Sequence, residues 1–175
     1  MRSLIVLSLV FLIYGNPIQR VSTASAGEDD FINTLTGKWQ GSGIVKVKTT
    51  APGIAVDCKF RSIADEQSLS LDGICRAFVV ITKRISAELV IANGRYSGVY
   101  RGARTGPATL GGSREGNDVA LKIGWAGIVN GDQMAQMNIQ RRGANQLVLE
   151  ISDTDPESGQ VLTTSRIELM RRSTN

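Results

Sequence analysis

The sequence predicts an all-β protein: a single antiparallel up-and-down β-barrel of eight to ten strands with a short N-terminal helical turn. Three observations predict it. Apolar and polar residues alternate over short stretches, turn-forming residues recur between them, and no long stretch of helical period follows the first 26 residues. No Pro- or Ser-rich linker divides the strands, so we expect one barrel, whose closure leaves no exposed sheet edge.

The first 26 residues are typical of a secretory signal peptide. Arg2 precedes an unbroken apolar run from Leu4 to Tyr14, and the small residues Ala24-Ser25-Ala26 follow. The run is well short of the roughly 20 apolar residues that cross a bilayer, which favours removal over a membrane anchor. We therefore expect cleavage after Ala26, a barrel domain over residues 27–175, and a periplasmic or secreted protein with no stable membrane span.

The charge balance does not point to nucleic acid. The formal charge is +4, and cleavage after Ala26 would remove Arg2 and Arg20 and leave +2. The Lys and Arg residues are scattered along the sequence and rarely stand beside aromatic residues. Nucleic-acid binding is therefore not expected.

The elements follow from alternation and turn residues, taken in chain order. They are a helical turn over 31–35, strands near 39–49, 54–62 and 69–80, a hairpin around 93–94, weaker strands around 108 and 119, and hairpins that turn at 130–131 and 153–159. Pro156 and Gly159 suit the last of these turns.

Asn93-Gly94 is the strongest turn signal, because this dipeptide favours the left-handed backbone of a two-residue hairpin turn. The resulting register places Ile91 opposite Tyr96, Leu89 opposite Gly98 and Ala87 opposite Tyr100. The apolar residues then share one face, as a half-buried hairpin requires.

Asn130-Gly131 is less simple. A two-residue loop would set the apolar face of one strand against the polar face of the other, because a one-residue slip inverts a face. A three-residue loop over 129–131 instead places Trp125 opposite Ala135, Ile123 opposite Met137 and Leu121 opposite Ile139. We expect the longer loop.

Cys58 and Cys75 are expected to form a structural disulfide. If the chain turns at residues 65–68, the two cysteines lie directly opposite each other, the inner face is mostly apolar, and Arg61 meets Asp72 on the outer face. The crosslink should stabilise the fold by about 3 kcal/mol through the unfolded state. The alternative, a redox-active pair, lacks the close Cys-X-X-Cys spacing.

The sequence contains no histidine, which removes the commonest general base and the usual zinc or haem ligand. With both cysteines crosslinked, thiolate metal sites are not expected either. Asp153, Asp155 and Glu157 are the one cluster that offers oxygens to a cation, but it lacks the calcium-loop spacing and a plain turn is favoured. We predict no enzyme, no cofactor, and no catalytic or metal-binding residue.

The segment Leu35-Thr-Gly-Lys-Trp39 resembles the Gly-X-Trp opening motif of the calycin barrels, which include lipocalins, avidins and nitrobindin-like proteins. In that group the tryptophan closes one barrel end and a late basic residue packs across it, a role for Arg166 or Arg171 here. The stretch Gly94–Tyr100 is similar to a strand of avidin-like barrels. The haem-binding histidine of nitrobindin-like proteins is missing. The order of Trp39 and two cysteines also resembles periplasmic metalloprotease inhibitors, more weakly.

Two functions fit this sequence. The first is an exported binding module for a small apolar or amphipathic ligand, with tyrosine hydroxyls as polar anchors. Its ligand-binding residues would be Leu71, Leu89, Tyr100, Trp125 and Met137. The alternative for these five is that they simply fill the interior, as side chains do in many eight-stranded barrels.

The second function is a protein-interaction module such as a protease inhibitor. Its acidic N-terminal segment, Gly27-Glu-Asp-Asp-Phe31, would insert into a partner's cleft. A disordered end is the plainer reading of such a segment.

Overall fold

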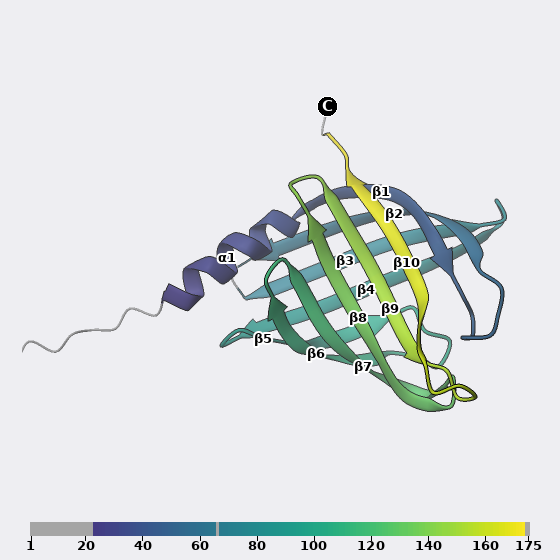
Figure 1. The fold of residues 1–175 in the computed structure, drawn as a ribbon. Helices are drawn as coiled ribbons and strands as arrows, with labels where there is room; N and C mark the ends of the chain where they lie inside the picture. The colour runs from purple at the N-terminus through teal and green to yellow at the C-terminus, as the bar shows by residue number, and fades with distance from the viewer. Residues whose placement is uncertain (1–22, 66, 174–175) are drawn as a thin grey trace, which may run out of the picture.

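The computed structural model describes residues 23–65 and 67–173, so most of the predicted signal peptide lies outside the described residues. The chain forms a closed antiparallel barrel in which consecutive strands pair and β1 pairs with β10 (Figure 1). The predicted fold class is confirmed. The elements are α1 (Thr23–Leu35), β1 (Gly37–Val45), β2 (Ile54–Asp65), β3 (Ser68–Ala77), β4 (Ile81–Ala92), β5 (Arg95–Arg101), β6 (Ala108–Glu115), β7 (Asp118–Val129), β8 (Asp132–Arg142), β9 (Gln146–Thr154) and β10 (Val161–Arg171).

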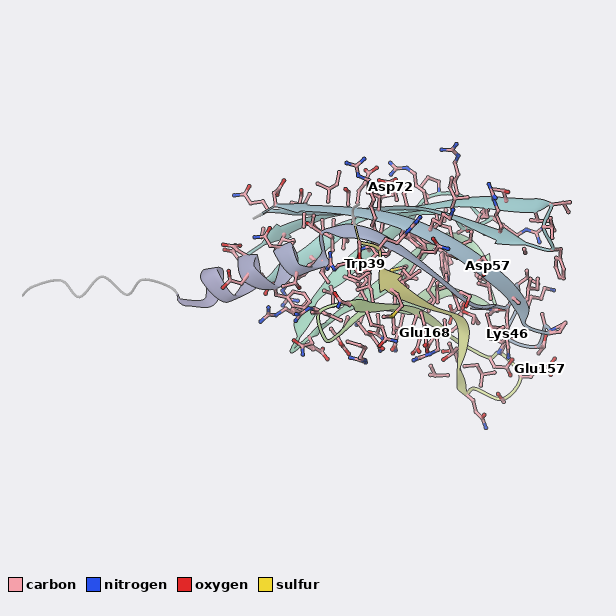
Figure 2. All side chains as sticks on the ribbon, turned by 90° about the horizontal axis from the view of Figure 1, so that it is seen from above. Trp39, Lys46, Asp57, Asp72, Glu157 and Glu168 are labelled. Atoms are coloured by element: carbon pink, nitrogen blue, oxygen red, sulfur yellow. A yellow bond between two sulfur atoms is a disulfide. The ribbon has the colours of Figure 1, made fainter. Side chains whose placement is uncertain are left out.

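The up-and-down order gives the barrel two different ends. One, called the α1 end below, holds α1 and the turns after β2, β4, β6 and β8. The other, called the mouth, holds the loops after β1, β3, β5, β7 and β9. Figure 2 shows Trp39 on the side of the helix and Lys46 and Glu157 at the mouth.

Helix α1 covers one end of the barrel with an apolar face. Phe31, Ile32 and Leu35 are all buried, and their spacing puts them on one side of the helix. The helix is longer than the predicted turn over 31–35, because it begins at Thr23 and runs through the predicted cleavage point.

Trp39 lies directly behind this helix and closes the barrel. Its side chain is buried, and its Nε1 donates a hydrogen bond to the Ser62 hydroxyl at 2.8 Å. The same hydroxyl donates to the carbonyl of Leu35, at the end of α1. Ser62 thus joins the indole of β1 to the helix and leaves neither buried polar group without a partner.

Arg171, and not Arg166, is the cation that packs on Trp39. Its guanidinium carbon lies 4.1 Å from the centre of the indole ring, and its nitrogens donate to the carbonyls of Thr34 and Thr36. These carbonyls at the end of α1 have no partner within the helix and carry its negative dipole end. A Cβ at Gly37 would lie 2.3 Å from Arg171 Nη1, which explains the glycine of the motif.

Arg166 lies on the outer face of the same strand. It pairs there with Glu150 at 2.6 Å and with Glu168 at 3.2 Å. Its predicted role at Trp39 is therefore assigned to Arg171 alone.

The disulfide between Cys58 and Cys75 is present, with an S–S distance of 2.02 Å and a Cα–Cα distance of 4.1 Å. The predicted register of β2 and β3 is confirmed, as is that of the Asn93-Gly94 hairpin. Arg61 and Asp72 do lie opposite each other, but no salt bridge joins them in the part of the chain that the structure describes.

The predicted register of β7 and β8 is wrong by two residues. Ile123, not Trp125, lies opposite Ala135, and Leu121 lies opposite Met137. The loop has two residues after all, with Val129 opposite Asp132, and an irregularity between Gly124 and Val129 absorbs the extra residues of β7. The shift is even, so the inward faces are those predicted.

The strand predicted near 69–80 is also too long, because β3 ends at Ala77. Phe78 and Val79 form the turn with φ angles of 50° and 65°, a left-handed conformation that such residues rarely adopt. The turn rules look for Gly, Asn, Asp or Pro, so this turn had no signal in the sequence.

Replacing Arg171 by Gln should lower the free energy of unfolding by about 2 kcal/mol, because the carbonyls of Thr34 and Thr36 lose their charged donor. The matched control is Arg166→Gln on the same strand, whose exposed ion pairs should contribute less than about 1 kcal/mol. Urea unfolding of both variants measures the difference. Equal losses for the two would contradict the role assigned to Arg171.

Candidate functional site

The five residues predicted to bind a ligand all lie in the barrel interior and are buried. Leu71, Tyr100 and Met137 line an enclosed void of about 40 Å³, whereas Leu89 and Trp125 do not. That volume has room for only a few water molecules, since one requires roughly 10–15 Å³ of such space. Small-molecule pockets measure roughly 300–1000 Å³. Side chains therefore fill the deep interior almost completely.

Trp125 and Tyr100 form a polar pair within this apolar interior. Their rings meet edge to face, with centroids 6.1 Å apart. Trp125 Nε1 is a buried donor with no hydrogen-bond acceptor among the described residues. Burial raises the pKa of Tyr100 to about 12, so its hydroxyl keeps its proton and can donate. A buried donor of this kind is unusual in a folded protein and needs an explanation.

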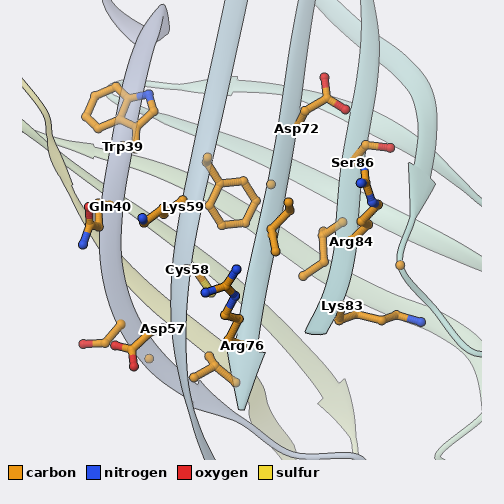
Figure 3. Close-up of a pocket in the computed structure, with 18 of the residues that line it drawn as sticks. Trp39, Gln40, Asp57, Cys58, Lys59, Asp72, Arg76, Lys83, Arg84 and Ser86 are labelled. Atoms are coloured by element: carbon orange, nitrogen blue, oxygen red, sulfur yellow. The ribbon is translucent and has the colours of Figure 1, made fainter. Parts of the chain in front are cut away.

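A second, far larger hollow lies along β1 to β4 and measures about 1420 Å³. Figure 3 shows Lys59, Arg76 and Arg84 on neighbouring strands of this sheet. The lining of β2 is continuous from residue 55 to residue 61 and so includes both outward and inward side chains. Because hydrogen-bonded strands separate the two faces, the hollow divides between an outer surface and an inner space.

The unpartnered edge of β4 explains how the two faces are connected. Pairing between β4 and β5 begins only at Ser86, so residues 81–85 have a neighbour on the β3 side alone. Inward-facing Lys83 and Ile85 line the hollow at this edge, together with Gly102 and Ala103 from the loop after β5. Near the mouth, β4 therefore has an unpaired edge that borders the hollow.

Phe60 and Ile85 form the wall between the open hollow and the enclosed void, since both side chains line both spaces. The ring of Phe60 lies on Gly73, directly across the β2–β3 pair, where an added Cβ would come within 2.2 Å of two ring carbons. The glycine thus allows the ring to lie against the sheet.

The hollow gathers basic residues that are scattered in the sequence. Its lining contains eight Lys and Arg residues but only two acidic ones, Asp57 and Asp72. The basic residues are Lys38, Lys59, Arg61, Arg76, Lys83, Arg84, Arg101 and Arg172. Arg101 is the one that pairs with an acidic residue outside the lining, Glu88, at 3.0 Å. Lys38, Lys59, Arg61, Arg76, Arg84 and Arg101 occupy outward positions of their strands, so they make the outer surface of the hollow cationic, whereas Lys83 is at an inward position.

No pattern in the sequence predicted this cationic hollow. Its residues come from four strands, and finding them requires the register between β3 and β4, whose turn had no recognisable signal. Once Asp57 is known to face Arg76, and Arg76 to face Thr82, the basic residues fall on neighbouring strands.

Asp153 and Asp155, at the last hairpin, accept hydrogen bonds from other residues of the protein. Asp155 accepts hydrogen bonds from the backbone N–H and hydroxyl of Ser158, which lower its pKa and close the turn. Asp153 is buried and accepts from Asn130 Nδ2 at 2.8 Å, while burial raises its pKa. Over residues 23–65 and 67–173, no group of three or more acidic, Cys or His side chains is placed to hold a metal ion.

The segment proposed as an inhibitory arm is held in place by the barrel. Gly27 to Asp30 belong to α1, and Arg114 of β6 donates to the carbonyl of Gly27 at 2.8 Å. Arg114 also lies 3.4 Å from the Glu28 carboxylate, which accepts from the Tyr96 hydroxyl. These contacts leave the segment in a helix rather than a free arm.

The comparisons with known proteins agree with the fold. No protein-family model and no curated protein sequence matches the chain. Among solved structures, the S-type phycobiliprotein lyase CPES from Guillardia theta is similar, with a TM-score of 0.57 and 11% sequence identity over 83% of this chain and 93% of that one. This likeness agrees with the closed antiparallel barrel of the structure. In the described part of the chain, no helix has the length and apolar character needed to cross a membrane.

Tyr96 and Tyr100 should stay protonated in the folded protein well above pH 10. Burial raises the pKa of Tyr100 to about 12; burial and the hydrogen bond to Glu28 raise the pKa of Tyr96 further. Unfolded tyrosines ionise near pH ~10, so the stability that these groups contribute is complete below that pH and is lost as the pH rises toward the folded values. Phenolate absorbance should therefore appear only together with loss of the β-sheet circular dichroism. A phenolate signal near pH ~10 in folded protein that lacks Tyr14 would contradict this.

Proposed function

We propose that the chain is an exported binding module, without catalytic activity, for a small amphipathic ligand that carries an acidic group. The observation that carries the proposal is the β1–β4 hollow, where Lys83 and Arg84 lie at an unpaired strand edge beside the apolar side chains of Phe60 and Ile85. A ligand with an anionic head and an apolar tail matches both parts.

The acidic head would be bound at the open edge of β4. Lys83 lies opposite Cys75, at an inward register position, and its exposed side chain extends past the edge of β4 (Figure 3). Arg84 follows on the outer face. Two cations on either side of one strand edge favour a carboxylate or phosphate, because charge-assisted hydrogen bonds are among the stronger ones.

The apolar tail would lie against Phe60 and Ile85. Deeper entry requires side chains to move, because the enclosed void holds only about 40 Å³. Met137 lines that void, and methionine adapts to new shapes more readily than branched side chains. A ligand oxygen that reached Trp125 Nε1 would supply the acceptor that this buried donor lacks.

Export is supported by the leader-like first 26 residues and by the disulfide, which persists in oxidising compartments. Cleavage after Ala26 would also place Glu28, Asp29 and Asp30 in the first turn of the shortened helix. Acidic residues stabilise that end of a helix.

The barrel that is similar in structure is titled a phycobiliprotein lyase. At 11% identity this likeness supports the barrel fold, and the class of ligand proposed here rests on the charges of the hollow. The inhibitor alternative has less support, since the segment 27–30 is held by Arg114.

Calorimetric titration with decanoate, and with decanol as the uncharged match, tests the proposal. The acid should bind at least about tenfold more tightly than the alcohol, a difference of ~1.4 kcal/mol. Ile85→Trp, which fills the space beside Phe60, should weaken decanoate binding by a similar factor. Val90→Trp on the outer face of the same strand is the control and should bind as the parent does.

Equal affinity for the acid and the alcohol would contradict the role of the basic residues. No binding of either compound, together with no small molecule in native mass spectra of protein from its own cell envelope, would contradict the binding module itself.

A further inference from the structure

The tip of the β3–β4 hairpin is a run of exposed large apolar residues. Phe78, Val79, Val80 and Ile81 are 67%, 94%, 82% and 56% exposed. Single exposed apolar residues are ordinary on a protein surface, but four in a row at one point are not. The run, named the apex below, lies at the mouth.

The apex stands clear of the barrel. β3 pairs with β2 only as far as Arg76, and β4 pairs with β5 only from Ser86 onward. At the tip, the Ala77–Ile81 pair has no neighbouring strand on either side, so the apex projects beyond the rest of the sheet. Figure 1 shows the strands of this sheet reaching past their neighbours at the end opposite α1.

The turn is strained, because apolar residues occupy backbone positions with positive φ angles. Phe78 and Val79 have φ angles of 50° and 65°, where Asn or Gly would be free of strain. A β-branched residue in this region is an outlier, and such outliers point to a role other than holding the turn. The N–H of Val80 donates to the carbonyl of Phe78 at 2.7 Å, so part of the turn's backbone is satisfied without water.

Basic residues stand directly behind the apex on both arms. Arg76 precedes it, and Lys83 and Arg84 follow it. From Gly73 to Ala87 the hairpin contains no acidic residue. On the neighbouring loop after β1, exposed Val47 is likewise flanked by Lys46 and Lys48. At the mouth, exposed apolar residues therefore stand at the ends of the loops, and basic residues flank them in the sequence.

We propose that the apex inserts into the surface of a lipid bilayer that contains anionic lipids, with Arg76, Lys83 and Arg84 at the level of the head groups. Apolar side chains at the acyl boundary and Lys or Arg at the head groups form the usual arrangement of interfacial membrane binding. Each basic residue near an anionic surface adds to the affinity.

A bilayer fits the apex better than a protein partner does. The apex is convex, and its side chains point in several directions around a tight turn. It offers no polar side chain to fix its orientation, whereas protein interfaces rely on hydrogen bonds as well as apolar anchors. A fluid apolar medium accepts such a shape without a matching pocket.

Sedimentation with phosphatidylcholine vesicles, with and without phosphatidylglycerol, tests this proposal. The protein is expressed from the whole sequence, and its N-terminus is determined by mass. The parent should sediment with the anionic vesicles and much less with phosphatidylcholine alone, and added salt should release it. Because all variants share the same N-terminus, differences between them report on the hairpin.

The double variant Phe78→Asn with Val79→Gly separates membrane binding from folding. Asn and Gly adopt the positive φ angles of positions 78 and 79 with less strain than Phe and Val, so the variant should unfold at the same urea concentration as the parent or a higher one. Its affinity for anionic vesicles should fall at least about tenfold, because the apolar apex is gone. The control is Val90→Asn, an exposed apolar position at the α1 end of β4, which should bind as the parent does.

The double charge reversal Lys83→Glu with Arg84→Glu tests the basic residues. Binding to anionic vesicles should weaken by at least about fivefold for each charge lost. Arg95→Glu, at the α1 end, is the matched control and should have no effect.

Full binding by the Asn-Gly variant would overturn the proposal. Failure of the parent to bind anionic vesicles would also overturn the proposal, and a protein partner would then be the better explanation for the apex. The charges of Lys83 and Arg84 belong to both proposals, but Ile85→Trp distinguishes them, because it should weaken decanoate binding and leave vesicle binding by the apolar apex unchanged.

Discussion

The contact of Arg171 with Trp39 and with the end of α1 is the interaction on which the rest of the structure depends. A barrel closes only when its first and last strands pair, and here Trp39 of β1 lies opposite Arg171 of β10. The guanidinium covers the indole and binds the carbonyls of Thr34 and Thr36, while Ser62 joins the indole to Leu35. Arg171 thus connects the junction of β1 and β10 with the end of the helix that covers this end of the barrel.

Closing one end completely has consequences for the other. With α1 and Trp39 filling the α1 end, any opening lies toward the mouth, where strands of unequal length leave β4 unpartnered over 81–85. Such an edge would invite pairing with another chain, and its Lys83 and Arg84 are the kind of residues that prevent it. The same charges make the opening cationic. Protection of an edge and attraction of an anion therefore come from the same side chains.

Local signals in the sequence were enough to predict the closed end, and much of the open end was beyond them. Trp39 with a late arginine, the opposed Cys58 and Cys75, and the Asn93-Gly94 turn each depend on neighbours that a register argument can place. The β7–β8 register failed because an irregularity between Gly124 and Val129 changes the count of residues without leaving a composition signal. The cationic hollow was missed because the Phe78-Val79 turn resembles a strand, and without it β4 has no register.

Phe78 and Val79 are common to both proposals, because they form part of the apex and also line the hollow. An apex inserted into a bilayer would bring Arg76, Lys83 and Arg84 to the anionic head groups, the same cations that would bind the head of a ligand. Lipid and ligand would then compete for one set of charges. Because coupling between two binding equilibria is reciprocal, a bound acidic ligand must weaken membrane binding by the factor by which the membrane weakens ligand binding. The arrangement would favour release of an acidic ligand at an anionic membrane and its retention in solution.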